Sequence, residues 1–224
     1  MASVLQTARQ LVNPILSIRN WKVLGKYVGL SGENNISLVS DIKSLSEFID
    51  SRASHVAQSS LYGYLKTRAG TRFPELFENP DILKSVNIAK WHIWIACVSD
   101  LTIFIATLAR QSDNSTDDVI SIMTGTFDQI IDRIGIPDEA GSDFAAAVAK
   151  ARQRIADIAL SDSVSDDDIF SQSPQALFYW SPIADELKDR DETIVRNSIR
   201  FRWIEVRRSC RKLIKFEQLF LSAL

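Results

Sequence analysis

Apolar residues recur at helical spacing along most of the chain. One clear series covers residues 37–68, with apolar positions at Leu38, Ile42, Leu45, Ile49, Ala53 and Val56. Intervals of three and four residues predict one long amphipathic helix. The chain has only eight glycines and six prolines, and no alternating strand pattern of convincing length. The pattern therefore predicts an all-α protein, a multi-helix bundle.

Proline, glycine and capping residues divide the remaining sequence into further helices. Asn79-Pro80-Asp81 is typical of a helix start, because Asn caps the first turn and Pro suits the first helical position. Ser115 begins another helix in the same way, with Asp118 as its acidic capping partner. The predicted helices cover residues 3–12, 14–28, 80–111, 115–135, 138–160, 174–187 and 192–221. We expect one domain over residues 1–224, with a mobile loop at 161–173.

The most apolar stretch, residues 86–109, is predicted to be the central helix of the bundle. Lys90, His92 and Asp100 interrupt it, so its uncharged runs fall short of the roughly 20 residues that cross a bilayer. Residues 1–20 lack the apolar core of a secretory signal, and two cysteines exclude a disulfide framework. We therefore expect a cytoplasmic protein, with peripheral contact to the inner membrane left open.

Charge is distributed unevenly along the chain. The net charge is +3 over residues 1–80, -9 over 81–188 and +4 over 189–224, which sum to -2. An acidic middle and basic ends attract each other either within one fold or between subunits. A homodimer is therefore one open possibility.

The basic end is concentrated in the final predicted helix. Between Ile194 and Lys215 there are eight basic residues and one acidic residue, Glu205. On a helical projection four arginines lie within an arc of about 60°, opposite an apolar stripe that includes Val195, Ile199 and Trp203. These candidate binding residues are Arg196, Arg200, Arg207 and Arg211. An arginine fork binds oxyanions in a fixed geometry, so we expect an acidic protein or an anionic membrane here, ahead of nucleic acid. The alternative is that these arginines pair with the acidic middle of the same chain.

A second basic and aromatic segment follows residue 58. Its candidate binding residues are Tyr62, Tyr64, Arg68 and Arg72. The sequence Leu61-Tyr62-Gly63-Tyr64-Leu65 resembles the recognition helix of TetR-type repressors, which commonly reads Thr-Leu-Tyr-x-Tyr-Phe. This resemblance implies a helix-turn-helix over residues 49–65, with Ser60, Tyr62, Tyr64 and Lys66 at the DNA. The alternative is that the tyrosines are amphipathic rings at a helix boundary.

The same segment supports one more resemblance. Together with residues 72–77 and 87–90, it is similar to an uncharacterised small all-helical family of alphaproteobacteria. That resemblance implies a bacterial origin and no mechanism.

Polar residues on the central helix are a third group of candidates. His92 and Asp100 lie eight residues apart, so they align about two turns from each other, with Trp94 between them. A polar group in a buried helix needs a partner. We therefore consider a ligand pocket formed by His92, Asp100 and Trp94, with a satisfied core pair as the alternative.

No catalytic motif accompanies these candidates. The sequence has no G-x-S-x-G, P-loop or Glu-x-x-His motif and no Cys/His cluster. We therefore expect no cofactor, no metal and no enzymatic activity. The predicted function is an interaction protein, such as an adaptor, assembly factor or accessory subunit, that binds through its basic final helix. A TetR-like DNA-binding regulator is the alternative.

Overall fold

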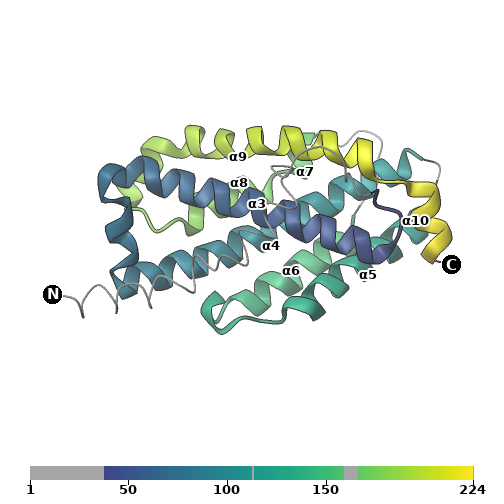
Figure 1. Ribbon diagram of the computed structural model, residues 1–224, viewed down its shortest axis with the longest axis horizontal. Coiled ribbons are helices and arrows are strands. Elements are labelled where there is room, and N and C mark those ends of the chain that lie inside the picture. Colours follow the sequence, from purple (N-terminus) through teal and green to yellow (C-terminus); the bar gives the residue numbers. More distant parts are fainter. Residues whose placement is uncertain (1–37, 113, 159–165, 224) are drawn as a thin grey trace, which may run out of the picture. The chain divides into compact units, whose positions relative to one another are not determined.

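The computed structural model describes residues 38–112, 114–158 and 166–223, which belong to one compact unit spanning residues 37–224. The helices predicted over 3–12 and 14–28 lie outside the described residues. Within the described ranges the regular structure is helical, which confirms the prediction of an all-α multi-helix bundle (Figure 1). The elements are α3 (Ile42–Ala69), the 3-10 helix η1 (Gly70–Phe77), α4 (Pro80–Arg110), α5 (Thr116–Ile134), the 3-10 helix η2 (Asp138–Ala140), α6 (Phe144–Ala156), α7 (Asp166–Ile169), α8 (Gln172–Trp180), α9 (Asp185–Leu213) and α10 (Phe216–Ala223).

Side-chain caps determine where several helices begin. Asn79 Oδ1 accepts hydrogen bonds from the backbone nitrogens of Asp81 (2.9 Å) and Ile82 (3.2 Å) at the start of α4. Ser115 Oγ accepts from the backbone nitrogen of Asp118 (3.1 Å) and donates to its carboxylate (2.6 Å). These caps satisfy amide groups that have no partner within the helix. Both predicted helix starts are confirmed.

Three predicted boundaries differ from the structure. The helix expected over 138–160 is divided, because Gly141 has a φ of +83° and separates η2 from α6. The helix expected over 174–187 is instead α8, at Gln172–Trp180. Residues 166–173 of the expected loop contain α7 and the beginning of α8, with Ile169 and Phe170 each 3% exposed. The rest of that predicted loop, 161–165, lies outside the described ranges.

The final predicted helix also divides into two. α9 begins earlier than predicted, at Asp185, and ends at Leu213, where Ile214 adopts an extended conformation. Val39 then forms an isolated parallel bridge with Ile214. Its backbone nitrogen donates to Leu213 O (3.0 Å), and its carbonyl accepts from Lys215 N (2.8 Å). This bridge ends α9, and α10 follows it.

α4 is the core helix of the bundle, as the sequence predicted. α3, α5, α6 and α8 pack around it, and α9 lies against α3 and α8 (Figure 1). Among the described helices, α4 alone has the length and apolar composition that a membrane span needs, but 89% of its most apolar window is buried within the protein. Burial against four neighbouring helices accounts for that composition.

The α4 cap leads to a stability prediction. Asn79→Ala removes the acceptor of two hydrogen bonds, so we expect a loss of about 1 kcal/mol in the free energy of unfolding, measured by urea denaturation. Asn79→Asp keeps an oxygen acceptor at the same place and should retain most of the stability. Equal losses in the two variants would contradict this role for the side chain.

Candidate functional site

α9 directs its apolar stripe into the bundle. Val195, Ile199, Trp203, Val206, Cys210 and Leu213 are all buried. These positions recur at helical spacing and lie opposite the solvent-facing side of α9. This buried stripe is the apolar stripe that the sequence predicted on the final helix.

The four predicted arginines lie along one edge of α9, and we call this set the basic face: Arg196, Arg200, Arg207 and Arg211. Three of them stand over aromatic rings of the bundle. The distances from guanidinium carbon to ring centroid are 5.2 Å for Arg196 and Phe178, 5.7 Å for Arg207 and Phe170, and 5.2 Å for Arg211 and Phe104. A guanidinium stacked on a ring keeps N–H groups at its edges for an oxyanion.

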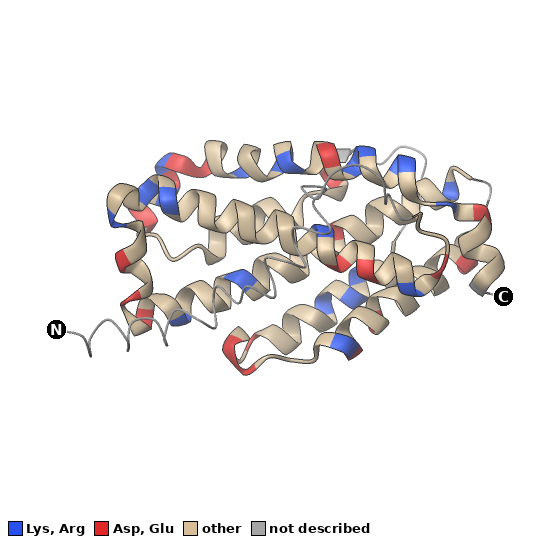
Figure 2. Cartoon of the chain, in the orientation of Figure 1, with Lys and Arg blue, Asp and Glu red and all other residues tan. Residues whose placement is uncertain are grey.

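The basic face keeps part of its charge without an acidic neighbour. Arg200 and Arg211 are exposed, and neither forms an ion pair with an acidic side chain in the described part of the chain. Arg196 pairs with Glu192 of the same helix at 2.8 Å. Figure 2 shows basic positions along the second half of α9 and acidic positions gathered near its beginning.

Several acidic residues of the chain's middle segment are paired within that segment. The N–O distances are 2.7 Å for Arg154 and Asp100, 2.8 Å for Arg152 and Asp128, and 2.8 Å for Lys90 and Glu139. These carboxylates are therefore not available to Arg200 or Arg211.

Tyr64 and Arg68 join α3 to α9. The Tyr64 hydroxyl donates to Asp191 at 2.9 Å, and Arg68 forms an ion pair with the same carboxylate. Arg68 lowers the pKa of Asp191, while burial and then Asp191 raise the pKa of Tyr64 to about 12. These two candidate binding residues hold two helices together.

The other two candidate binding residues of this segment are Tyr62, which contacts η1, and Arg72, which lies within it. Tyr62 packs edge-to-face on Phe77, with ring centroids 6.3 Å apart, and burial raises the pKa of its hydroxyl. Arg72 remains 80% exposed and pairs with Glu75 at 3.1 Å.

Residues 49–65 do not form a helix-turn-helix. They lie within the single uninterrupted helix α3, so the turn that separates the two helices of that motif is missing from this stretch. Ser60 and Tyr64 are buried, at 2% and 8% exposure. The structural expectation from the TetR resemblance is wrong here.

Two of the three predicted pocket residues share a neighbour, because the rings of His92 and Trp94 both lie near Phe144, with centroids 5.7 Å and 6.4 Å away. The Trp94 indole donates to Asp50 at 3.1 Å, on α3. His92 stacks on Trp180, with centroids 3.7 Å apart and planes inclined by 15°. Asp100 contacts Arg154 and Ser173. His92 and Trp94 therefore belong to one aromatic cluster, and Asp100 lies in a polar network with Arg154 and Ser173.

Asp100 lies in a polar network that the sequence did not reveal. Its carboxylate is fully buried and accepts from Arg154 Nη1 (2.7 Å) and from the backbone nitrogen of Ser173 (2.8 Å). Ser173 Oγ in turn accepts from the indole of Trp203 (3.0 Å). Burial raises the pKa of Asp100, and Arg154 opposes that rise. The network joins α4, α6, α8 and α9.

Burial favours the neutral forms of His92 and Cys97, two titratable side chains on α4. Burial lowers the pKa of His92, whose Nε2 has no hydrogen-bond partner. Burial raises the pKa of the Cys97 thiol well above its usual range. A protonated thiol is a poor nucleophile. Neither group is activated for nucleophilic chemistry.

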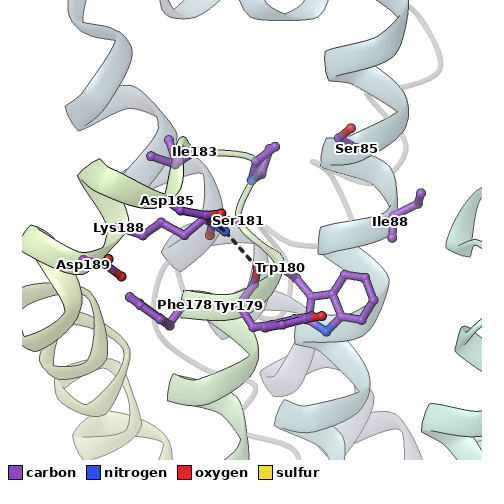
Figure 3. A pocket seen from close by; sticks show the side chains of 11 residues that line it. Ser85, Ile88, Phe178, Tyr179, Trp180, Ser181, Ile183, Asp185, Lys188 and Asp189 are labelled. Atoms are coloured by element: carbon purple, nitrogen blue, oxygen red, sulfur yellow. Dashed lines mark hydrogen bonds and ion pairs between the residues drawn. The ribbon is translucent and has the colours of Figure 1, made fainter.

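One described pocket, of about 530 Å³, lies between α4, α8 and the beginning of α9 (Figure 3). Ser85, Tyr179, Trp180 and Lys188 are among its lining residues. The Lys188 ammonium is already engaged, because it donates to the Tyr179 carbonyl (3.2 Å) and pairs with Asp185 (3.2 Å). The pocket therefore presents aromatic surface beside an ammonium group that is already paired.

A row of exposed apolar side chains on α9 was also missed by the sequence analysis. The exposures are 39% for Leu187, 72% for Ile194, 70% for Phe201 and 43% for Ile204. We call these four residues the outer stripe, since they lie opposite the buried stripe. Their spacing of seven, seven and three residues was the available signal.

The described residues contain no cluster of three or more His, Cys, Asp or Glu side chains able to hold a metal ion. Comparisons with protein-family models, curated proteins and solved structures give no match. The interpretation of the site therefore depends on its geometry.

The Asp100 network leads to a stability prediction. Arg154→Met leaves a buried carboxylate without its ion-pair partner, so we expect a loss of about 3–5 kcal/mol in the free energy of unfolding, measured by urea denaturation. Adding Asp100→Leu removes the unpaired carboxylate and should recover part of that loss. A double variant less stable than Arg154→Met alone would contradict this account.

His92 leads to a pH prediction. Its pKa is lowered in the folded protein, so the unfolded chain binds more protons as the pH falls through about 6.5, and stability decreases. We expect the melting temperature to fall between pH 7.5 and pH 5.5, and to fall less in His92→Phe. His55, whose pKa burial also lowers, contributes in the same direction, so the double variant His55→Gln/His92→Phe should lose more of the pH dependence than either single variant. An unchanged pH dependence in His92→Phe would refute the assignment.

Proposed function

We propose that this protein is a non-enzymatic interaction module that holds an acidic segment of another protein on the basic face of α9. The proposal is supported above all by the exposed charge of that face, where Arg200 and Arg211 have no acidic partner in the described chain. Cations that a fold does not neutralise internally attract an external anion. An adaptor, assembly factor or accessory subunit would use such a surface.

The support beneath the arginines favours ordered recognition. Phe178, Phe170 and Phe104 each lie under one guanidinium of the basic face. A side chain held before binding loses less conformational entropy when its partner arrives. Carboxylates match the planar guanidinium fork in shape and charge, which makes an acidic peptide segment a suitable ligand.

The experiment compares binding of the full chain to fluorescent polyglutamate before and after neutralisation of the basic face. Arg196, Arg200, Arg207 and Arg211 are changed together to Gln, which keeps polar side chains of moderate length. We expect affinity to fall at least about tenfold, because each charge-assisted hydrogen bond contributes about 1.5–3 kcal/mol. Fluorescence anisotropy at low and moderate salt measures the change.

The matched control neutralises four exposed lysines on other helices. Lys43, Lys66, Lys84 and Lys150 changed to Gln remove the same charge from α3, α4 and α6. This control should bind polyglutamate nearly as well as the wild type. Equal losses in the two variants would show a general charge effect and refute the proposal.

Two other anions serve as competing ligands in the same experiment. Vesicles of anionic lipid test for a membrane surface, and duplex DNA tests for the regulator alternative. Preferential binding to either one, with weak binding to polyglutamate, would overturn the acidic-protein assignment. Circular dichroism and thermal unfolding of the arginine variant show whether the fold is retained.

A further inference from the structure

The outer stripe of α9 has the spacing of a helix-packing surface. Leu187, Ile194 and Phe201 recur every seven residues, and Ile204 follows three residues later. Apolar positions at intervals of seven and three residues form the seam of paired helices. Since the inward side of α9 already packs against the bundle, a second helix must come from outside this unit to cover the stripe.

Charge along α9 reverses from one end to the other. Residues 185–192 hold five acidic and two basic side chains, and residues 196–212 hold seven basic and one acidic. At the acidic end Asp185, Glu186 and Asp189 are exposed, and the Asp185 side chain is 90% exposed. A parallel copy of the helix would oppose like charges, whereas an antiparallel copy would bring the acidic end of one helix beside the basic end of the other at both ends of the seam.

We infer that two copies of this chain associate through α9, antiparallel and about a two-fold axis, with the outer stripe as the apolar centre of the interface. The partner is therefore a second copy of the chain. An interface of this kind is isologous, because the same surface serves both subunits. The inference does not depend on the proposed binding of an acidic protein.

The spacing also assigns a register. Leu187 of one copy lies opposite Ile204 of the other, and by symmetry each contact occurs twice. Glu186 then lies beside Arg207 of the second copy. The centre of the seam brings Ile194 near Asn197 of the second copy. Phe201 then lies opposite Arg190 of the second copy. Each end of the interface thus contains apolar contact together with a Glu186–Arg207 pair of opposite charge.

Two-fold symmetry has a consequence for the basic face. An axis perpendicular to the two helices leaves a given edge of α9 on the same side of the pair in both subunits. The two basic faces therefore lie on the same side of the dimer and extend from its centre toward opposite ends. The pairing itself needs no acidic ligand.

The first experiment measures mass by sedimentation equilibrium over a range of concentrations of the full chain. We expect the wild type to associate to twice the 25.2 kDa chain mass. Ile194→Glu should weaken dimerisation at least about tenfold, because it places two like charges close to the two-fold axis, each near Asn197 of the other copy. Leu221→Glu, on α10 and 73% exposed, is the matched control and should leave dimerisation unchanged.

The second experiment exchanges charge between the ends of α9. One variant carries Asp185, Glu186 and Asp189 changed to Lys, and the other carries Arg200, Arg207 and Arg208 changed to Glu. Each variant alone should be monomeric, since its two ends have like charge. An equal mixture should form heterodimers, because every end then meets one of opposite charge.

Within one chain the two ends of α9 are too far apart to form ion pairs with each other. Residues 186 and 207 are separated by about 30 Å along the helix, at 1.5 Å per residue. Recovery in the mixture therefore reports contact between chains. Thermal unfolding of each variant verifies that the monomer remains folded.

The outcomes are distinct. A wild type that stays monomeric, a dimer unaffected by Ile194→Glu, or a mixture that remains monomeric would each overturn the inference. Loss of the dimer in Ile194→Glu with polyglutamate binding retained would support the dimer independently of the proposed function, because all four arginines of the basic face are intact in that variant.

Discussion

The buried carboxylate of Asp100 is the constraint on which the arrangement of the helices depends. A carboxylate removed from water is costly unless charge and hydrogen bonds compensate for it. Arg154 supplies the charge from α6, and the backbone of Ser173 supplies a hydrogen bond from α8. Ser173 also accepts the hydrogen bond of Trp203, so the position of α9 is linked to the same carboxylate. Apolar packing alone would permit these helices to slide, whereas directional bonds to one buried group select a single arrangement.

This arrangement gives α9 three different environments around its axis. The buried stripe packs on α3 and α8, the basic face stands over aromatic rings at one edge, and the outer stripe faces solvent. A helix that serves only as a structural support needs the first of these. The other two leave basic charge and apolar side chains at the surface of α9, and these features support the proposed interaction role.

Much of the fold was predictable, because long helices have a local signal. Apolar spacing predicted a helix over residues 37–68, and Asn79 marks the beginning of α4. The Asp41 cap, which was not predicted, makes α3 begin later, at Ile42. The break between η2 and α6 at Gly141 was harder to predict, since the positive φ of this residue depends on neighbouring segments. The end of α9 at Ile214 depends on a backbone partner, Val39, that is remote in sequence. Periodicity contains no information about such pairings.

The candidate site was predictable only in part, because periodicity contains no information about contacts between segments that are remote in sequence. The basic face follows from the spacing of arginines along one helix, so a projection finds it. The pairing of Asp191 with Tyr64 and Arg68, more than 120 residues away, depends on how α3 and α9 pack, and so does the pairing of Asp100 with Arg154 across α4 and α6. A projection of one helix cannot distinguish a tyrosine that binds a ligand from one that joins two helices.

The bridge between Val39 and Ile214 has a mechanical consequence. Its two backbone hydrogen bonds connect the beginning of the described unit to the segment between α9 and α10. Tension applied between residues 38 and 215 would act on these two bonds first, before any helix is stretched. The whole bundle from α3 to α9 lies inside the loop that they close. By closing this loop, the two hydrogen bonds shield the bundle from forces transmitted along the chain.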